Sequence, residues 1–288
     1  MSTDKLILGT AQLGLNYGIN NNLGKPTLDE GNQILNIAFE KGIRTLDTAG
    51  VYGTAHKVIG NYHKENSNNK FKIITKLPKS FNSSDLELII KNYLEELNTE
   101  RIETLMFHSL ESYQNHIDEI ETFKSDNFYN KIGVSVYLNE EVDCLINDER
   151  IDIVQLPFNL FDNVSRRGKV IKLLKDYGKT VHVRSIFLQG LFFKKIECNN
   201  DIVNNLKDEL IQISLYSKKY KIGISDMAMS YCLNQDNIDM VIFGVESINQ
   251  LNENIKSANK KLDERLVDQI NSINIENHNF LNPSKWTK

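Results

Sequence analysis

The sequence is poor in the features that mark several classes of protein. It has only three cysteines, Cys144, Cys198 and Cys232, which lie far apart and form no CxxC pair. This odd, scattered set argues against a disulfide framework or a zinc site and fits a reducing compartment. Lysine and arginine number 34 against 38 acidic residues, for a net charge of −4. Without a basic surplus, binding to nucleic acid or to an anionic membrane surface is not expected.

Long apolar runs and flexible linkers are missing as well. No segment approaches the roughly 20 apolar residues that a membrane-spanning helix needs. The N-terminus MSTDKLILGT lacks the basic start and apolar stretch of a secretion signal. No linker rich in proline, glycine or serine divides the 288 residues, of which 40% are apolar and can fill a sizeable core. We therefore expect a cytoplasmic protein with one domain, residues 1–288, that acts on a small molecule.

Short β-type runs alternate with amphipathic segments along the whole chain. The runs are rich in Ile, Val, Thr and Phe, and several are apolar on both faces, as buried parallel strands are. They cover residues 6–10, 43–47, 71–76, 102–108, 131–135, 151–156, 180–185 and 239–244. Helical patterns lie between them at 27–42, 83–98, 165–179 and 247–260, and an extra helix is expected at 201–220.

Eight strand–helix units in a chain of this length favour an α/β fold, a closed (β/α)8 TIM barrel. The alternative is a doubly wound sheet, which would carry a GxGxxG fingerprint after an early strand. The glycines of GTAQLG, residues 9–14, have the wrong spacing for it. We expect the tail 280–288 to lie across the barrel mouth. Residues expected to shape a pocket there are Phe158, Asn159, Phe161, Trp286 and the loop 191–200.

Polar side chains follow the predicted strands, as in IRTLDTAGVYG, residues 43–53. Asp47 ends the second strand and Tyr52 follows it, while Lys76 ends the third strand and His108 the fourth. Active sites of barrel enzymes lie where the strands end. A lysine would lower the pKa of a neighbouring tyrosine, an aspartate would hold the lysine charged, and a histidine would orient a carbonyl. Each residue alone has an ordinary structural explanation, but four together favour a catalytic site.

The ordered series of motifs resembles the aldo/keto reductase family. The similarity runs through LGTAQLG, GIRTLDTAGVYG, ITK, MFHS, GVS, VQLPFN and VIFGVESINQLNEN. The resemblance implies a (β/α)8 barrel that binds a nicotinamide cofactor across the strand ends. It also implies reduction of an aldehyde or ketone to an alcohol, without a metal. The implied cofactor is NADP(H), the usual one in the family, with NAD(H) as the alternative.

The resemblance also implies roles for individual residues. Tyr52 matches the general acid, Lys76 the residue that lowers its pKa, Asp47 the partner of the lysine, and His108 the residue that orients the carbonyl. Ser135 and Gln155 match residues that hold the nicotinamide carboxamide, residues 185–190 the loop over the pyrophosphate, and residues 244–254 the adenosine end, with Glu253 and Asn254 on the adenine ring. The implied cofactor contacts are Gly9, Thr10, Ala11, Asp47, Ser135, Gln155, Arg184, Ser185, Phe187, Leu188, Gly190, Gly244, Val245, Glu246, Ser247, Gln250, Glu253 and Asn254.

Some positions depart from the family pattern. Arg184 replaces the usual aromatic residue that stacks on the nicotinamide; it could stack there instead, reach a substrate anion, or lie on the surface. Ser135 is followed by Val136 where Asn is common, so one amide contact is missing. His56 stands where relatives commonly have Glu, and we expect it on a helix surface, with a second catalytic histidine as the alternative.

The adenosine segment departs further from the pattern. Gly244 and Gln250 replace the Lys and Arg that commonly grip the 2′-phosphate of NADP, and Glu246 adds negative charge nearby. A preference for NAD, or use of both cofactors, therefore stays open.

Two other functions also stay open. A lyase or aldolase could use Lys76 as a Schiff-base amine, although Asp47 should keep that amine protonated. A regulatory subunit could bind the cofactor with little turnover, although the four intact residues argue against it. The sequence names neither the substrate nor the oligomeric state.

Overall fold

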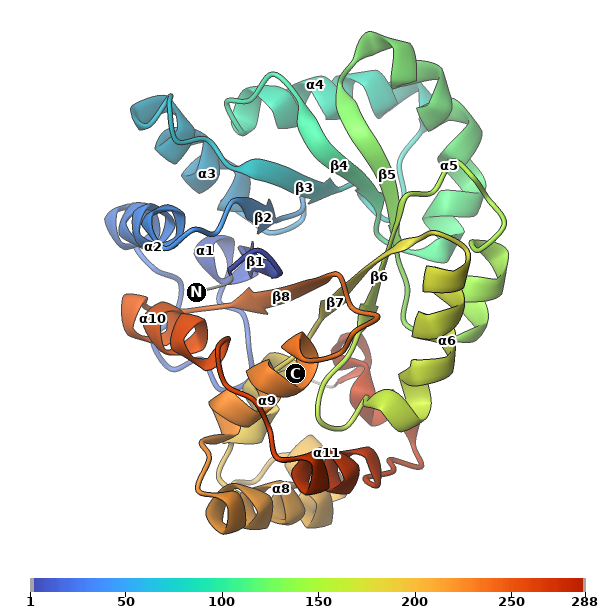
Figure 1. Ribbon diagram of the computed structural model, residues 1–288. Coiled ribbons are helices and arrows are strands. Elements are labelled where there is room, and N and C mark those ends of the chain that lie inside the picture. Colours follow the sequence, from blue (N-terminus) through green and yellow to red (C-terminus); the bar gives the residue numbers. More distant parts are fainter. Residues whose placement is uncertain (1–2, 287–288) are drawn as a thin grey trace.

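The computed structural model describes residues 3–286 and contains eight parallel strands closed into a barrel (Figure 1). Each strand pairs with the next one in the chain, and β8 pairs with β1. The strands are β1 (Leu6–Gly9), β2 (Thr45–Asp47), β3 (Lys72–Lys76), β4 (Ile102–Phe107), β5 (Tyr129–Ser135), β6 (Ile153–Pro157), β7 (Thr180–Arg184) and β8 (Met240–Gly244). The predicted barrel is confirmed, because every predicted strand is present within two residues of its expected bounds.

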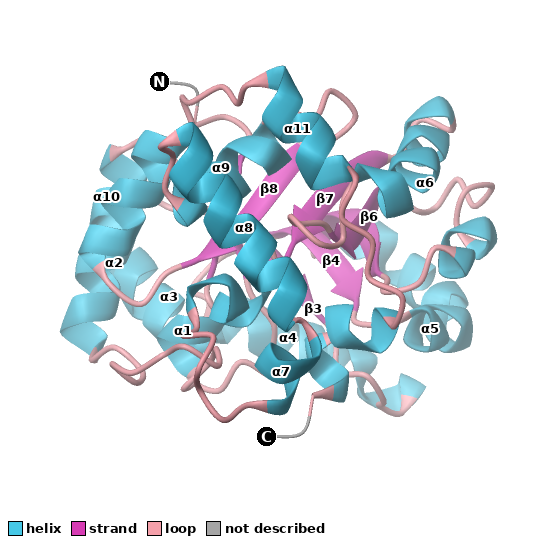
Figure 2. Cartoon of the chain, turned by 90° about the horizontal axis from the view of Figure 1, so that it is seen from below, coloured by secondary structure: helices cyan, strands magenta, loops and turns pink. Residues whose placement is uncertain are grey.

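Helices surround the barrel, as the cyan coils around the magenta strands show in Figure 2. They are α1 (Ala11–Gly14), α2 (Leu28–Glu40), α3 (Ala55–Glu65), α4 (Leu86–Glu96), α5 (Leu110–Thr122), α6 (Val164–Asp176), α7 (Asp201–Asn205), α8 (Lys207–Tyr220), α9 (Ile224–Leu233), α10 (Ile248–Ser257) and α11 (Glu264–Asn271). Their apolar faces and the outer faces of the strands form the large core.

Polar side chains set where several of these helices begin. Thr27 and Glu30 form a reciprocal capping box at the start of α2, and Ser247 accepts a hydrogen bond from the Gln250 backbone at the start of α10. One helix prediction was wrong in detail, because 201–220 forms two helices. The backbone at Leu206 leaves helical geometry (φ −115°, ψ 23°) and its side chain is buried, which ends α7 before α8 begins.

The interior of the barrel carries the sequence pattern that builds the site. A small apolar cluster fills it, made of Ile7, Ile74, Met106, Ile153 and Ile242. Side chains two positions apart on a strand point to the same side. The residues two positions after these five are Gly9, Lys76, His108, Gln155 and Gly244. These five residues therefore form the layer above the apolar cluster, at the carboxyl ends of the strands.

The C-terminal segment does not cover that layer. Phe280 and Trp286 pack against the outer core, and no residue between 278 and 286 lines the cavity described below. The expectation of a tail across the mouth was wrong for these residues; 287 and 288 lie outside the described part.

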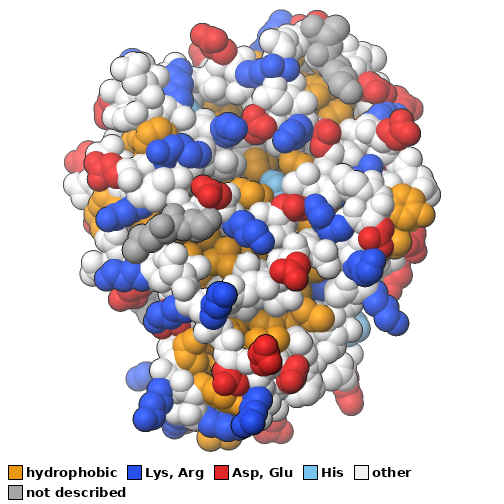
Figure 3. All heavy atoms as spheres, viewed as in Figure 1, with side chains coloured by type: hydrophobic (Ala, Val, Ile, Leu, Met, Phe, Trp, Pro, Cys, Tyr) orange, Lys and Arg blue, Asp and Glu red, His pale blue; other side chains and the backbone are white. Residues whose placement is uncertain are grey.

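Within residues 3–286, no helix is long and apolar enough to cross a membrane, and no group of three His, Cys, Asp or Glu side chains could hold a metal ion. On the face shown in Figure 3, acidic and basic side chains are interspersed.

Candidate active site

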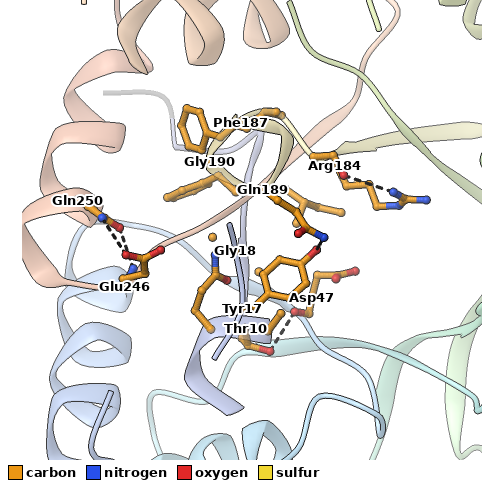
Figure 4. Close-up of a pocket in the computed structure, with 18 of the residues that line it drawn as sticks. Thr10, Tyr17, Gly18, Asp47, Arg184, Phe187, Gln189, Gly190, Glu246 and Gln250 are labelled. Atoms are coloured by element: carbon orange, nitrogen blue, oxygen red, sulfur yellow. Dashed lines mark hydrogen bonds between the residues drawn. The ribbon is translucent and has the colours of Figure 1, made fainter. Parts of the chain in front are cut away.

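A cavity of about 590 Å³ opens at the carboxyl ends of the strands (Figure 4). All eight strands contribute to its wall, each through a residue at or near its C-terminal end. These residues are Gly9, Asp47, Lys76, His108, Ser135, Gln155, Arg184 and Gly244. The structure therefore brings together the four predicted catalytic residues, since Tyr52 also lines the cavity.

A buried ion pair lies at the floor of the cavity. Lys76 Nζ donates to Asp47 Oδ1 at 2.6 Å and to the backbone oxygen of Thr48 at 3.2 Å, and both charged side chains are almost fully buried. Gln155 Nε2 donates to the other oxygen of Asp47 at 2.9 Å. Both carboxylate oxygens are thus satisfied. Burial lowers the pKa of Lys76, and Asp47 works against that shift.

Tyr52 reaches the same floor from the turn after β2. A side chain on Gly14 would clash with the backbone oxygen of Tyr52, so a glycine is required where α1 meets this turn. Gly53 follows with a positive φ of 56°, which glycine adopts without strain. The ring of Tyr52 then lies with its centroid 5.5 Å from Lys76 Nζ. It meets the His108 ring edge to face, at 6.3 Å between centroids.

The pKa of Tyr52 shifts in the direction opposite to the one expected from the sequence. Burial raises it, and the charge of Asp47 adds to the increase. The cation that works to lower the pKa of Tyr52 is Arg184, and its effect is smaller than those of burial and Asp47. Tyr52 therefore keeps its proton throughout the neutral pH range.

His108 is a neutral imidazole in this environment. Burial, with the positive charges of Lys76 and Arg184, lowers its pKa to about 4. Its Nδ1 is buried and has no hydrogen-bond partner among the described residues. A neutral ring carries one N–H donor and one acceptor, which suits it to hydrogen-bond an uncharged carbonyl oxygen.

Most of the predicted cofactor residues line the same cavity. Those that do, beyond the strand-end residues, are Thr10, Ala11, Ser185, Phe187, Gly190, Glu246, Gln250, Glu253 and Asn254. Three predicted contacts do not reach it. Leu188 and Val245 are buried in the core, and Ser247 caps α10 instead. Each of the three is next to a residue that lines the cavity. The apolar side chains of Leu188 and Val245, however, are buried in the core.

The loop after β1 closes one side of the cavity. Tyr17 Oη accepts a hydrogen bond from Gln189 Nε2 at 3.1 Å, and the Ile19 backbone N–H donates to the Gln189 oxygen at 3.0 Å. Figure 4 shows Tyr17, Gly18 and Gln189 between Asp47 and the adenosine-end residues Glu246 and Gln250. The loops after β1 and β7 thus meet over the cavity. Gln189 belongs to the loop 185–190 that the sequence predicted, whereas other lining residues were missed: Tyr17, Gly18, Asn20, Asn22, Leu23 and Tyr137.

Several sequence expectations about neighbouring residues were wrong. His56 is not a surface residue: it is 2% exposed, and its Nε2 lies 2.9 Å from Thr75 Oγ1 on the outer side of β3. Phe158 and Phe161 are core residues outside the cavity: Phe158 stacks on Tyr231, and Phe161 meets Phe192 edge to face. The other expected pocket residues, Asn159 and Trp286, do not line the cavity either, and within 191–200 only Phe193 does.

Comparison with known proteins shows the family to which the chain belongs. The sequence profile described as "Aldo/keto reductase family" matches residues 5–275. The chain belongs to the aldo/keto reductase family. It is 24% identical to the Bacillus subtilis (strain 168) protein "Uncharacterized oxidoreductase YqkF" over 300 aligned residues, which cover 94% of each chain. Aldo/keto reductases generally use NAD(P)H, so membership implies an oxidoreductase.

Solved structures of aldo/keto reductases have the same fold. The holo form of AKR11C1 from Bacillus halodurans aligns with a TM-score of 0.77 at 19% identity, over 95% of this chain and 94% of that one. The putative aldo-keto reductase PA4992 from Pseudomonas aeruginosa aligns with a TM-score of 0.67 at 19% identity, over 88% and 89%. At these identities the similarity concerns the barrel and leaves the substrate open.

Proposed function

We propose that the protein is an NAD(P)H-dependent carbonyl reductase that converts an aldehyde or ketone to an alcohol. The observation that carries the proposal is the arrangement of Tyr52 above the Lys76–Asp47 ion pair, with a neutral His108 against its ring. These groups share one cavity with most of the residues that match the family's cofactor contacts.

The residues present fit a nicotinamide cofactor. Gln155 Oε1 is buried and has no hydrogen-bond partner in the described part of the chain, so it can accept from a carboxamide N–H. Ser135 pairs with Gln155 across β5 and β6 and offers a hydroxyl beside it. The adenosine end would be held by Glu253 and Asn254, on the α10 side of the cavity.

The chain's own residues supply the proton for the reduction. When bound, the reduced nicotinamide supplies the hydride that adds to the carbonyl carbon. Tyr52 donates its phenolic proton to the carbonyl oxygen as negative charge develops there, and the neutral His108 ring donates an N–H to the same oxygen. The phenolate that Tyr52 becomes lies near Lys76, whose position Asp47 fixes, and near the positive charge of Arg184.

We propose further that NADH is preferred over NADPH. Lys76 and Arg184 are the only lysine and arginine that line the cavity in residues 3–286, and neither is at the adenosine end. Glu246 lies there instead, with Gln250 Nε2 at 3.5 Å from its carboxylate. A 2′-phosphate would meet an acidic side chain and no cation, whereas a ribose hydroxyl can donate to Glu246.

The two alternatives have less support. A Schiff-base role would need a free, unprotonated amine. Lys76 Nζ instead donates hydrogen bonds to Asp47 and to the backbone oxygen of Thr48. A regulatory subunit with little turnover would not need the proton-donating arrangement around Tyr52.

Incubation of the purified protein with NADH or NADPH and a panel of aldehydes tests the proposal. We expect aldehyde-dependent loss of the reduced cofactor and formation of the matching alcohol. Cofactor that binds but is oxidised by no aldehyde would favour the regulatory subunit. Substrate trapped on Lys76 by borohydride, without any cofactor requirement, would favour the Schiff-base enzyme.

A further inference from the structure

Arg184 is a cation inside the site without a carboxylate of its own. It ends β7, is half-buried, and lines the cavity together with Tyr52, Lys76 and His108. The other buried cations nearby are paired: Lys76 with Asp47 at 2.6 Å, and Arg167 with Asp162 at 2.6 Å. No ion pair joins Arg184 to an acidic group within residues 3–286. A partly buried unpaired charge is unfavourable unless a ligand compensates it.

The contacts of Arg184 leave much of its hydrogen-bonding capacity unused. Its guanidinium stacks on the Tyr137 ring, 4.1 Å from the centroid. It donates to the Val136 oxygen at 3.2 Å and weakly to Ser185 Oγ at 3.4 Å. A guanidinium has five N–H donors in a planar fork that matches a carboxylate. Donors therefore remain for a ligand.

The residue on which the guanidinium stacks is itself held by a buried ion pair. The buried Arg167 donates to the Tyr137 backbone oxygen at 2.7 Å, and Asp162 holds Arg167 through both carboxylate oxygens. Tyr137 is thus anchored through its backbone, and its ring lies against the guanidinium of Arg184. A side chain held in this way binds an anion without first losing conformational freedom.

The anion that Arg184 binds could belong to the cofactor or to the substrate, and the direction of the side chain distinguishes the two. Its partners Val136 and Tyr137 follow β5, on the side of the barrel that also carries His108. In Figure 4 the side chain points away from Glu246 and Gln250, which mark the adenosine end. The cofactor's pyrophosphate is expected at the loop 185–190, whose Phe187 and Gly190 lie on the Glu246 side of Arg184 in Figure 4. A substrate whose carbonyl is next to His108 would lie on the side of Arg184.

We propose that Arg184 binds a carboxylate of the substrate, so that the enzyme reduces carbonyl compounds that carry an acid group. The inference rests on the proposed reductase activity and adds the substrate class to it. Arg184 would fix the acid group of such a substrate while its carbonyl oxygen lies between Tyr52 and His108.

A matched pair of substrates tests the inference. The probes are 4-carboxybenzaldehyde and its uncharged methyl ester, compared by the ratio of their kcat/KM values. The wild type should favour the carboxylate, and Arg184→Gln should lower the ratio by about tenfold or more, as expected for a hydrogen-bonded ion pair. Arg184→Lys should keep part of the preference. The control Arg265→Gln changes an exposed arginine on α11 and should leave the ratio unchanged.

Binding measurements separate failure of this inference from failure of the proposed activity. The product analogue 4-(hydroxymethyl)benzoate should bind to wild type more tightly than its methyl ester, and Arg184→Gln should remove that difference even if no aldehyde is turned over. Equal ratios for wild type and Arg184→Gln, or equal binding of acid and ester, would overturn the inference. A tenfold weaker NADH affinity in Arg184→Gln with an unchanged ratio would assign the cation to the cofactor phosphates and also overturn it.

Discussion

Lys76 and Asp47 form a 2.6 Å ion pair in which both side chains are almost fully buried. Such a pair contributes little net stability compared with apolar residues, but removing one partner leaves an uncompensated buried charge. The pair therefore matters most for position, because Asp47 fixes the Lys76 ammonium 5.5 Å from the centroid of the Tyr52 ring.

Lys76→Met should destabilise the protein and abolish turnover. The variant leaves Asp47 buried without its cation, which costs about 3–5 kcal/mol in the free energy of unfolding. The double variant Lys76→Met/Asp47→Asn should recover much of that stability but none of the activity. Urea unfolding and steady-state rates of the three proteins measure this. Equal urea midpoints for wild type and Lys76→Met would contradict the energetic account of the pair.

The rate of reduction should be nearly independent of pH over the neutral range. Burial raises the pKa of Tyr52 above its ordinary value near 10, and it lowers the pKa of His108 to about 4. Both groups therefore keep their protonation states between about pH 5 and 9. The measurement is kcat/KM for an uncharged aldehyde across that range. A loss of rate centred near pH 7 would show that another group controls the proton transfer.

His182 should make stability depend on pH in the acid range. It is buried on β7, its Nδ1 has no partner among the described residues, and burial lowers its pKa from 6.5 to about 4. Between these values the unfolded chain binds more protons, so the free energy of unfolding falls as pH drops from 6.5 to 4. His182→Leu should reduce that slope by up to about 1.4 kcal/mol per pH unit. Equal slopes in chemical denaturation of the two proteins would contradict this.

The barrel and its catalytic layer were predictable because both depend on local sequence. Strand composition and a two-residue alternation fix the pairs Ile74 and Lys76, and Met106 and His108, on the inner face of neighbouring strands. Closure of eight parallel strands then brings their ends together.

The remaining features depend on contacts between distant segments. The meeting of Ile19 with Gln189 joins loops that are far apart in the chain, and nothing in either loop alone indicates it. The burial of His56 follows from packing of α3 against β3. The rise in the pKa of Tyr52 follows from burial, which the sequence pattern does not quantify.

Tyr137, by contrast, is a missed site residue that the local sequence could have indicated, because it is an aromatic residue two positions after Ser135.

Glu246 should control the choice of cofactor. The wild type is expected to bind NADH more tightly than NADPH, because no lysine or arginine among residues 3–286 lines the adenosine end of the cavity. Glu246→Gln should improve NADPH binding by about tenfold, and Glu246→Arg should improve it further. Fluorescence titrations give both dissociation constants, with the exposed Glu276→Gln as control. A wild type that prefers NADPH, or a Glu246→Arg variant with an unchanged ratio, would contradict the prediction.

Substitution of Tyr52 by phenylalanine tests the central claim most directly. The Tyr52→Phe variant keeps the ring against Lys76 and His108 but lacks the proton donor. We expect single-turnover reduction of an aldehyde to slow by at least about a hundredfold. The dissociation constant for NADH should stay within about twofold of wild type. The control Tyr177→Phe, which removes the hydroxyl of an exposed tyrosine, should behave as wild type. A Tyr52→Phe enzyme that reduces aldehydes at the wild-type rate would show that this hydroxyl is not the acid.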